Sequence, residues 1–398
     1  MKSKTCQIGN ANLTSQKLVR IINAFVFAKD MDSNKKFELI KRNTEEIMTD
    51  EDLKGLFESG TKIKHYIGFE ISGKIHLGTG LMCMSKVKDF MDAGIDCSIF
   101  LADWHSWIND KLGGDRETIK KVAGGYFKEG LKASLKCFGG EHDKLKFILG
   151  SDLYHNNDNY WATMVEISKN TTLARIMRSI TIMGRKEGEC IDFAKLIYPP
   201  MQVADIFIQG INLPHAGLDQ RKAQVIARDV ALKIKTKPLL DKKGNTIKPV
   251  AVHHHLILGL GKPPVWPVPK NQLQELWSVL KMSKSKPDTC IFIHDSPEEI
   301  KRKINQAFCL EGEVEFNPIL DWAKYLIFRD DDSKLEIKRS EKFGGNIMYS
   351  SYMELERDFS QKKLHPLDLK NAVAERLIQI LEPARKHFEQ PRLKKMLE

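Results

Sequence analysis

Short apolar runs alternate with longer helical segments through the first half of this chain. The runs 66–69, 97–101 and 145–149 are compact and apolar, whereas 81–93 and 115–138 have the length and composition of helices. Strands separated by helices lie parallel in one sheet, because a parallel connection has to return across the sheet. The sequence therefore predicts an α/β fold around a parallel sheet.

The rest of the chain is mainly helical in pattern. We expect 155–235 to be mostly helical with an interruption at the Tyr-Pro-Pro of 198–200, because proline lacks the N–H that a helix uses. A further strand is expected within 249–260. From Ser296 onward the pattern is helical again and rich in lysine.

These patterns divide the chain into three parts. Residues 35–60 are expected to form two helices, the second beginning near Thr49, where Asp52 three places on resembles a capping box. The expected parts are an N-terminal helical extension (1–61), an α/β domain with a helical insertion (62–286) and a helical domain (287–398).

Composition narrows the class of partner only a little. The net charge is +11 and the pI about 9.1, which favours a polyanionic partner because lysine and arginine release counterions from phosphates. Many basic proteins bind no nucleic acid, so both interpretations stay open. No apolar run has the length of a membrane span, and the polar start Met1 to Gln16 has no apolar signal region. We therefore expect a cytoplasmic protein with no membrane partner.

The seven cysteines are scattered and include no Cys-x-x-Cys pair. Such a set argues against a disulfide framework and against a zinc site. Reduced thiols are the expected state, and no protein-bound metal is expected.

Residues 76–80, His-Leu-Gly-Thr-Gly, follow a strand and a turn and open a helix. A helix N-terminus presents unpaired N–H groups and partial positive charge, which favours phosphate. Gly78 lets a nucleotide approach the backbone, and His76 can donate to phosphate oxygens. The alternative is an ordinary glycine-rich helix start with a surface histidine.

Residues 281–285, Lys-Met-Ser-Lys-Ser, lie among turn-forming residues roughly 200 positions later. Two lysines spaced by three can straddle a triphosphate and offset charge as pyrophosphate departs. The alternative is a solvated basic loop. The order and context of the two motifs together favour an ATP site.

With these motifs the chain resembles a tyrosyl-tRNA synthetase of the archaeal and eukaryotic type, a class I aminoacyl-tRNA synthetase family. The similarity runs from about Phe37 to the C-terminus. It implies a Rossmann-like parallel sheet as catalytic domain and a mostly α-helical C-terminal anticodon-binding domain. The further matching segments are 66–70 (Tyr-Ile-Gly-Phe-Glu), 101–105 (Leu-Ala-Asp-Trp-His), 197–199 (Ile-Tyr-Pro), 201–203 (Met-Gln-Val), 219–222 (Asp-Gln-Arg-Lys) and 365–371 (His-Pro-Leu-Asp-Leu-Lys-Asn).

Tyr198, Gln202 and Asp205 are spaced i, i+4, i+7, which places them on one face of a helix. Taken alone, such a trio favours a hydrogen-bonded core cluster. The resemblance implies instead that Tyr198, Gln202 and Gln220 hold the α-amino end of L-tyrosine. It implies that Tyr66 and Asp205 hold the phenolic hydroxyl. Phenylalanine would leave that pair buried and unsatisfied, which is costly.

For ATP, the resemblance implies catalytic roles for His76, Lys281 and Lys284 through charge stabilisation on the transferring phosphoryl group. Mg²⁺ is expected with ATP, carried mainly by the phosphates. Thr79 departs from the pattern, because archaeal relatives carry histidine there; its hydroxyl can still donate to phosphate. The expected ATP-binding residues are Gly68, His76, Gly78, Thr79, Lys281, Ser283 and Lys284.

For tRNA(Tyr), the resemblance places Phe343, His365 and Asp368 at the first anticodon base. RNA loops are read by stacking on aromatic rings and by hydrogen bonds to base edges, which suits these residue types. Arg221 is placed at the first acceptor-stem pair. Their alternative roles are ordinary caps and surface residues. The resemblance also implies a homodimer.

Two features carry no assigned role in this family pattern. The consecutive histidines at 253–255 could suggest a metal, but successive strand residues point to opposite faces, so we expect a strand flanking the ATP site. The segment 262–279 is expected to be an insertion. Two rival functions remain: an inactive paralogue kept for RNA binding or scaffolding, and a synthetase for another aromatic amino acid.

Overall fold

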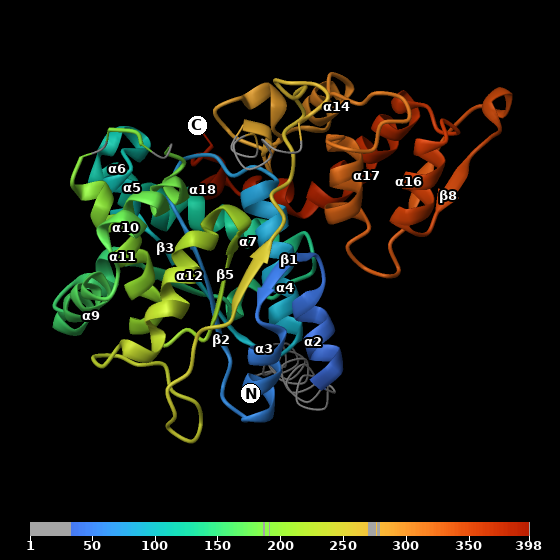
Figure 1. Cartoon of the computed structure of the whole chain (residues 1–398). Coiled ribbons are helices and arrows are strands. Elements are labelled where there is room, and N and C mark those ends of the chain that lie inside the picture. Colours follow the sequence, from blue (N-terminus) through green and yellow to red (C-terminus); the bar gives the residue numbers. More distant parts are fainter. Residues whose placement is uncertain (1–32, 186–187, 191, 270–275, 277–278, 398) are drawn as a thin grey trace, which may run out of the picture.

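The computed structural model describes residues 33–185, 188–190, 192–269, 276 and 279–397 (Figure 1). A six-stranded sheet lies at the centre of one body, and a mainly helical C-terminal part extends from it. Expectations for 1–32 and for part of the 262–279 insertion lie outside the described residues.

The sheet has the strand order β1-β6-β5-β2-β3-β4. Neighbours from β6 to β4 pair in parallel, and β1 at the edge runs antiparallel to β6. The predicted α/β fold around a parallel sheet is thus confirmed. The strands are β1 (Thr44–Met48), β2 (Lys64–Phe69), β3 (Asp96–Leu101), β4 (Lys146–Leu149), β5 (Leu213–Gly217) and β6 (Ala251–His254).

The prediction of helix throughout 35–60 is wrong at 44–48, which form the edge strand β1. Glu45 and Glu46 gave this segment a helical composition. In the sheet their carboxylates meet partners from distant segments: Glu46 pairs with Arg221 at 2.8 Å, and Glu45 pairs with His255 at 2.8 Å. Tertiary partners therefore override local propensity here.

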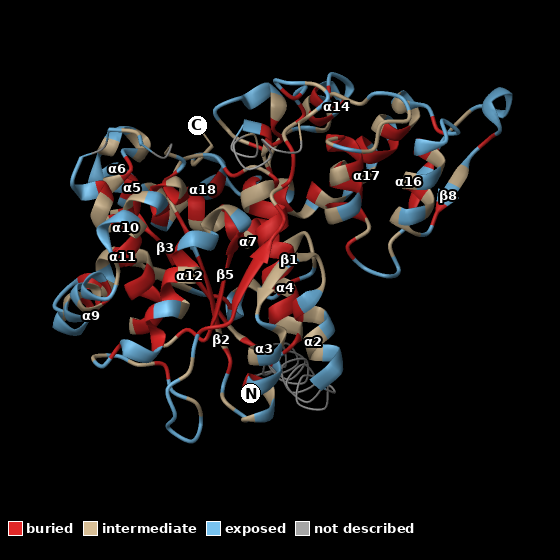
Figure 2. Ribbon diagram, viewed as in Figure 1, coloured by how far each residue is buried: buried red, intermediate tan, exposed pale blue. Residues whose placement is uncertain are grey.

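Alternation along the strands divides the core into two faces. The central strands are largely buried (Figure 2). Ile67 and Ile99 belong to one hydrophobic cluster with helices α4 (Cys83–Asp92) and α7 (Lys128–Lys136). Tyr66 and Phe100, one residue away, belong to a second cluster with α9 (Asp158–Lys169), α11 (Ala194–Ile208) and α12 (Arg221–Val230). The period of two is what a strand covered on both faces requires.

Shorter helices complete this body, and the second N-terminal helix begins where the pattern indicated. Thr49 caps the second N-terminal helix, accepting from the Asp52 N–H at 3.2 Å, as the capping pattern predicted. These helices are α2 (Ser33–Lys41), α3 (Asp50–Glu58), α5 (Asp103–Ile108), α6 (Arg116–Val122), α8 (Gly150–Tyr154) and α10 (Leu173–Ser179).

The predicted interruption at 198–200 is wrong, because α11 runs unbroken through Pro199 and Pro200. The two prolines remove two backbone donors, which weakens a helix. Burial offsets this loss: residues 198–201 and 203–207 are all buried between the sheet and α9. The helix that carries the candidate tyrosine ligands is therefore held by packing and not by its own propensity.

The C-terminal part is mainly helical, as predicted, but it also contains a two-stranded hairpin that was not predicted. Its longest helix, α17 (Pro366–Phe388), packs against α7 of the sheet body (Figure 1). The ring of Phe388 stacks on that of Tyr126, in the turn before α7, with the ring centroids 5.6 Å apart. The boundary near Pro287 stays a prediction. The elements are α14 (Pro297–Asn305), α15 (Pro318–Trp322), β7 (Leu335–Ile337), β8 (Ile347–Tyr349), α16 (Tyr352–Ser360), α17 (Pro366–Phe388) and α18 (Pro391–Lys394).

Candidate active site

One buried carboxyl lies between the sheet and α11. Asp205 is 1% exposed, and its Oδ1 accepts a hydrogen bond from the Tyr154 hydroxyl at 3.0 Å. Burial raises the pKa of Asp205 well above its usual range, and the Tyr154 hydrogen bond acts against this. Tyr66 is buried in the same cluster, and burial together with the Asp205 charge raises the pKa of its phenol. The structure thus brings the two predicted hydroxyl-binding residues into one polar site.

A histidine that we did not predict completes this end of the site. His105 Nε2 lies 3.8 Å from Asp205 Oδ2, too far for a hydrogen bond, and is a buried atom without a hydrogen-bond partner in the described part of the chain. Burial lowers the pKa of His105 to about 3, so the ring is neutral. A buried polar atom without a partner is a candidate contact for a ligand group.

The three residues expected at the α-amino end also lie together. Tyr198 and Gln202 project from α11, and Gln202 Nε2 donates to Gln220 Oε1 at 3.2 Å. Gln202 Oε1 is buried and has no hydrogen-bond partner among the described residues. Tyr198 donates to Glu70 Oε1 at 2.9 Å, so a carboxylate that we did not predict also belongs here. The acceptors at this end suit an ammonium group.

His76 precedes a π-helical turn, Gly78–Met82, that leads into α4. Its Nδ1 accepts from the Gly78 N–H at 3.1 Å, and its Nε2 lies 3.4 Å from Thr79 Oγ1. Burial first, and then the charges of Lys284 and Lys281, lower the pKa of His76 to about 4. The ring is therefore neutral, and its Nε2–H is the group that can donate to a ligand.

The two distant motifs meet through backbone pairing. Leu77 N–H donates to Ile291 O at 3.0 Å, and Ile293 N–H donates to Ile75 O at 3.1 Å, which fixes the His76 segment beside the chain that follows Lys281–Ser285. A β-carbon built on Gly73 would lie 3.9 Å from Lys284 Nζ. The turn before the first motif is therefore next to the second.

The two lysines of the second motif differ in their surroundings. Lys281 Nζ pairs with Asp219 Oδ2 at 2.6 Å. Lys284 has its pKa lowered to about 8, by burial and then by the charge of Lys111. Ser283 hydrogen-bonds to Ser285 within the same loop at 2.9 Å.

The two glycines expected at ATP have different constraints. Gly68 is exposed at the end of β2. A β-carbon at Gly78 would lie 3.0 Å from the His76 ring, tighter than ordinary contact. A side chain at position 78 would therefore displace the His76 ring.

The residues expected at tRNA occupy two surfaces. Arg221 forms a bidentate pair with Glu46 at the sheet edge. His365 caps α17, accepting at Nδ1 from Leu367 N–H at 3.2 Å, and Asp368 lies in its first turn. Phe343 is 64% exposed and precedes the loop that leads to β8. Arg339, which follows β7, donates to Lys363 O at 3.2 Å and so links this hairpin to the segment before α17.

The three consecutive histidines have separate partners. His253 Nδ1 lies 3.0 Å from Glu46, His254 bonds to His215, and His255 pairs with Asp321 at 2.7 Å. In the described ranges no cluster of three or more His, Cys, Asp or Glu side chains could hold a metal ion. None of the described helices is long and apolar enough to cross a bilayer.

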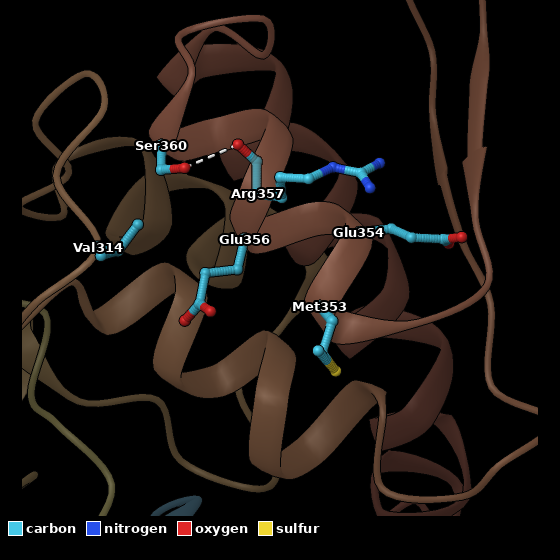
Figure 3. Close-up of a pocket in the computed structure, with 6 residues that line it drawn as sticks. All are labelled: Val314, Met353, Glu354, Glu356, Arg357 and Ser360. Atoms are coloured by element: carbon cyan, nitrogen blue, oxygen red, sulfur yellow. Dashed lines mark hydrogen bonds between the residues drawn. The ribbon is translucent and has the colours of Figure 1, made fainter.

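A surface hollow of about 440 Å³ lies elsewhere (Figure 3). It sits on α16 in the C-terminal part, and Arg357 and Glu354 point away from Glu356 and Val314 in this view. Its lining contains none of the expected site residues. The site is therefore assigned from side-chain chemistry at the sheet.

Sequence reasoning missed four polar residues of this site. Glu70, His105 and Asp219 stand inside motif segments that carried the family resemblance, so a signal was present without a role attached. Tyr154 stands outside those segments, and only its contact with Asp205 reveals it.

The family model for class I tRNA synthetases of the tryptophan and tyrosine type matches residues 58–382. The chain therefore belongs to the class I tRNA synthetases. Within them it groups with archaeal tyrosine–tRNA ligases. The chain is 61% identical to the tyrosine–tRNA ligase of Thermococcus gammatolerans over 90% of this chain and 96% of that protein.

Two solved structures show the same arrangement. The tyrosyl-tRNA synthetase of Pyrococcus horikoshii, complexed with L-tyrosine, is 55% identical, covers 92% of this chain and 100% of its own, and superposes with a TM-score of 0.89. That of Archaeoglobus fulgidus, also complexed with L-tyrosine, is 37% identical over 89% of this chain and 99% of its own, with a TM-score of 0.74.

Proposed function

We infer that this chain attaches L-tyrosine to tRNA(Tyr) at the expense of ATP. The tyrosine carboxylate attacks the α-phosphorus, pyrophosphate leaves, and the terminal ribose hydroxyl of tRNA then takes the tyrosyl group from the adenylate. Neither step uses a protein nucleophile. The identity with archaeal tyrosine–tRNA ligases and the buried polar site at Asp205 support this function.

The observation that carries the tyrosine assignment is the pair of unsatisfied buried atoms. Gln202 Oε1 would accept from the α-ammonium group, and the space between His105 Nε2 and Asp205 Oδ2 would take the phenolic hydroxyl. The hydroxyl donates to the carboxyl and accepts from the imidazole, so both ends of tyrosine are satisfied. Phenylalanine would satisfy only one end.

The residues of the two ATP motifs would stabilise the negative charge of the phosphates. His76 Nε2–H and Lys284 would donate to phosphate oxygens, and Lys281 would exchange Asp219 for the leaving pyrophosphate. The N–H groups of the π-helical turn add positive potential. Mg²⁺ would arrive with ATP, held mainly by the phosphates.

For tRNA, we propose that Arg221 contacts the acceptor stem and that Phe343, His365 and Asp368 read the anticodon. The exposure of Phe343 and the position of Asp368 in the first turn of α17 support this assignment. We also propose a catalytic domain over 62–286, an anticodon-binding domain over 287–398, a homodimer and a cytoplasmic location.

Amino-acid-dependent ATP–pyrophosphate exchange, run separately with tyrosine, phenylalanine and tryptophan, tests the function. Exchange with tyrosine alone is expected. Exchange with tryptophan only would overturn the tyrosine assignment. Absence of exchange with all three, in a folded protein, would instead favour the inactive paralogue.

A further inference from the structure

Three imidazoles lie side by side inside the sheet, one on each of three neighbouring strands. His65 is on β2, His215 on β5 and His254 on β6, and their exposed fractions are 0%, 1% and 4%. Two of them pack on Phe90 of α4, with ring centroids 4.6 Å from His65 and 5.3 Å from His215. Rings this polar are costly inside a protein unless their nitrogens are hydrogen-bonded.

The rings are linked into a chain that leads to the ATP motif. His65 Nε2 lies 3.2 Å from His215 Nδ1, and His215 Nε2 lies 2.8 Å from His254 Nδ1. His254 Nε2 lies 3.5 Å from Cys83 Sγ on α4. The Cys83 thiol in turn donates to the carbonyl of Gly78 at 3.3 Å.

Only one order of protons satisfies all the links. If the thiol donates to Gly78 O, its sulfur accepts from His254 Nε2–H, and each ring nitrogen Nε2–H then donates toward Gly78 in turn. The remaining atom, His65 Nδ1, carries no proton in this order, and it is a buried atom without a partner among the described residues. The opposite order would leave His65 Nδ1–H as a buried donor and would remove the thiol proton from Gly78.

The rings are neutral, as this order requires. Burial lowers the pKa of His65 to about 3 and that of His254 to about 4, and it lowers the pKa of His215 well below its usual value. Burial also raises the pKa of the Cys83 thiol, so the thiol keeps its proton. The chain is a fixed hydrogen-bonded structure and not a titrating one.

The end of the network binds the backbone of one residue of the ATP motif, Gly78, on both of its polar groups. The Gly78 N–H is bound by His76 Nδ1, and the Gly78 carbonyl is bound by Cys83. A β-carbon built on Gly217, which would lie 3.4 Å from His254 Nε2, would also lie 2.7 Å from Asp219 Oδ1. Asp219 is the partner of Lys281, so His254 lies near the acidic residue that pairs with the second ATP motif.

We propose that His65, His215, His254 and Cys83 form a positioning network. This network holds the Gly78 backbone, and through it His76, in the position that binds ATP. This inference rests on the proposed ATP site. None of the four is among the residues assigned to a substrate, and the network ends at the ATP motif, so their effect should appear in the interaction with ATP and not in the tyrosine pocket.

Substitution of Cys83 tests the network with a matched pair. Cys83→Ala removes the donor to Gly78 O, and Cys83→Ser keeps one. In tyrosine-dependent ATP–pyrophosphate exchange, Cys83→Ala should raise the KM for ATP by about threefold to tenfold while the KM for tyrosine stays constant. Cys83→Ser should return the KM for ATP to within about twofold of the parent value. Equal values for the two variants, or an unchanged KM for ATP in Cys83→Ala, would overturn the proposal.

Infrared spectroscopy provides a readout that does not depend on activity. The S–H stretch of Cys83, identified as the band lost in Cys83→Ala, should lie at the frequency of a hydrogen-bonded thiol. It should shift in His254→Leu and shift less in His254→Gln, whose amide can donate to the sulfur. A band unaffected by either change would contradict the network. Absence of tyrosine-dependent exchange in the parent protein would instead contradict the proposed function while leaving the infrared result valid.

Discussion

The proposed tyrosine pocket and the proposed ATP elements lie on the same sheet but are built in opposite ways. Asp205 is buried and is held by Tyr154, while Gln202 is held by Gln220, before any ligand is bound. Lys281, in contrast, is partly exposed and already paired with Asp219. In the proposed function, selectivity is therefore preorganised, whereas the phosphate-binding charges would have to exchange partners.

The same comparison explains how burial is used. At the pocket, burial leaves a few polar atoms unsatisfied, so only a ligand with matching groups is accepted. At the proposed ATP site, burial lowers the pKa of His76 to about 4, which leaves a neutral ring that donates from Nε2–H. Burial lowers the pKa of Lys284 to about 8, which makes its ammonium group a stronger donor to phosphate. Substitutions should therefore change selectivity at one site and rate at the other.

The largest effect is expected from Asp205→Ala. Loss of the carboxyl removes a hydrogen bond to the phenol that costs about 3–4 kcal/mol to break in a buried site, so the preference for tyrosine over phenylalanine should fall roughly 10²- to 10³-fold. Exchange assays with each amino acid measure this ratio. Asp205→Asn, which keeps an acceptor of the same shape, should lose less.

This change should not unfold the protein. The raised pKa of Asp205 means that the folded state disfavours its charge, so removal of the carboxyl should leave the thermal midpoint unchanged or raise it. A variant that still discriminates against phenylalanine as the parent does would show that the hydroxyl is read elsewhere.

A smaller effect is expected from Lys284→Ala. One preorganised donor to a phosphoryl transition state contributes roughly 10²-fold in rate, so kcat for pyrophosphate exchange should fall by about that factor. The Tyr/Phe ratio should not change, in contrast to the pocket variant. Lys286→Ala is the matched control, because this lysine is exposed in the same loop. An equal loss in both variants would point to general loop charge.

Much of this arrangement could be predicted from the sequence. Apolar runs at 66–69 and 97–101 are strands because both of their faces are covered, and the spacing of Gln202 and Asp205 puts both on one face of α11. Local pattern was sufficient in these cases because the buried face repeats with the period of the element.

The failures have a common physical origin in contacts between distant segments. The two glutamates of β1 favour a helix by propensity, and partners far along the chain, Arg221 and His255 among them, stabilise them in a strand. His105 gained a role only when Asp205 was found 3.8 Å away. Single-sequence patterns contain no information about such pairings.

The third prediction concerns the ion pairs of His255 in the sheet that carries both sites. His255, at the end of β6, lies between Glu45 and Asp321, and Asp321 also accepts from the Leu258 N–H at 2.9 Å. Burial lowers the pKa of His255, but the hydrogen bonds to Asp321 and Glu45 outweigh this effect and raise the pKa to about 9. These contacts join the first strand, the sheet and α15.

The sign of the pH dependence follows from this raised pKa. The stabilisation is complete below the unfolded-state pKa of about 6.5 and is lost as the pH rises through about 9. We expect a loss of about 2 kcal/mol in the free energy of unfolding between pH 7 and pH 10. Urea unfolding of the parent and of His255→Gln measures it, and the variant should lack this component. Parallel pH profiles would exclude the cluster as the source.

The smallest expected effect is a pH dependence that distinguishes the two sites. Because the pKa of Lys284 is lowered to about 8, its charge is lost as the pH rises through that value, and kcat/KM for ATP should fall about tenfold between pH 7 and pH 9. Lys284→Arg keeps its charge throughout this range, so its profile should stay level even if its rate is lower. The Tyr/Phe ratio of the parent should stay constant over the same range, since the rings and carboxyl of the pocket are shielded from solvent. A ratio that changes together with kcat/KM would mean that the two sites share a titrating group, and the distinction between a preorganised pocket and exchangeable charges would fail.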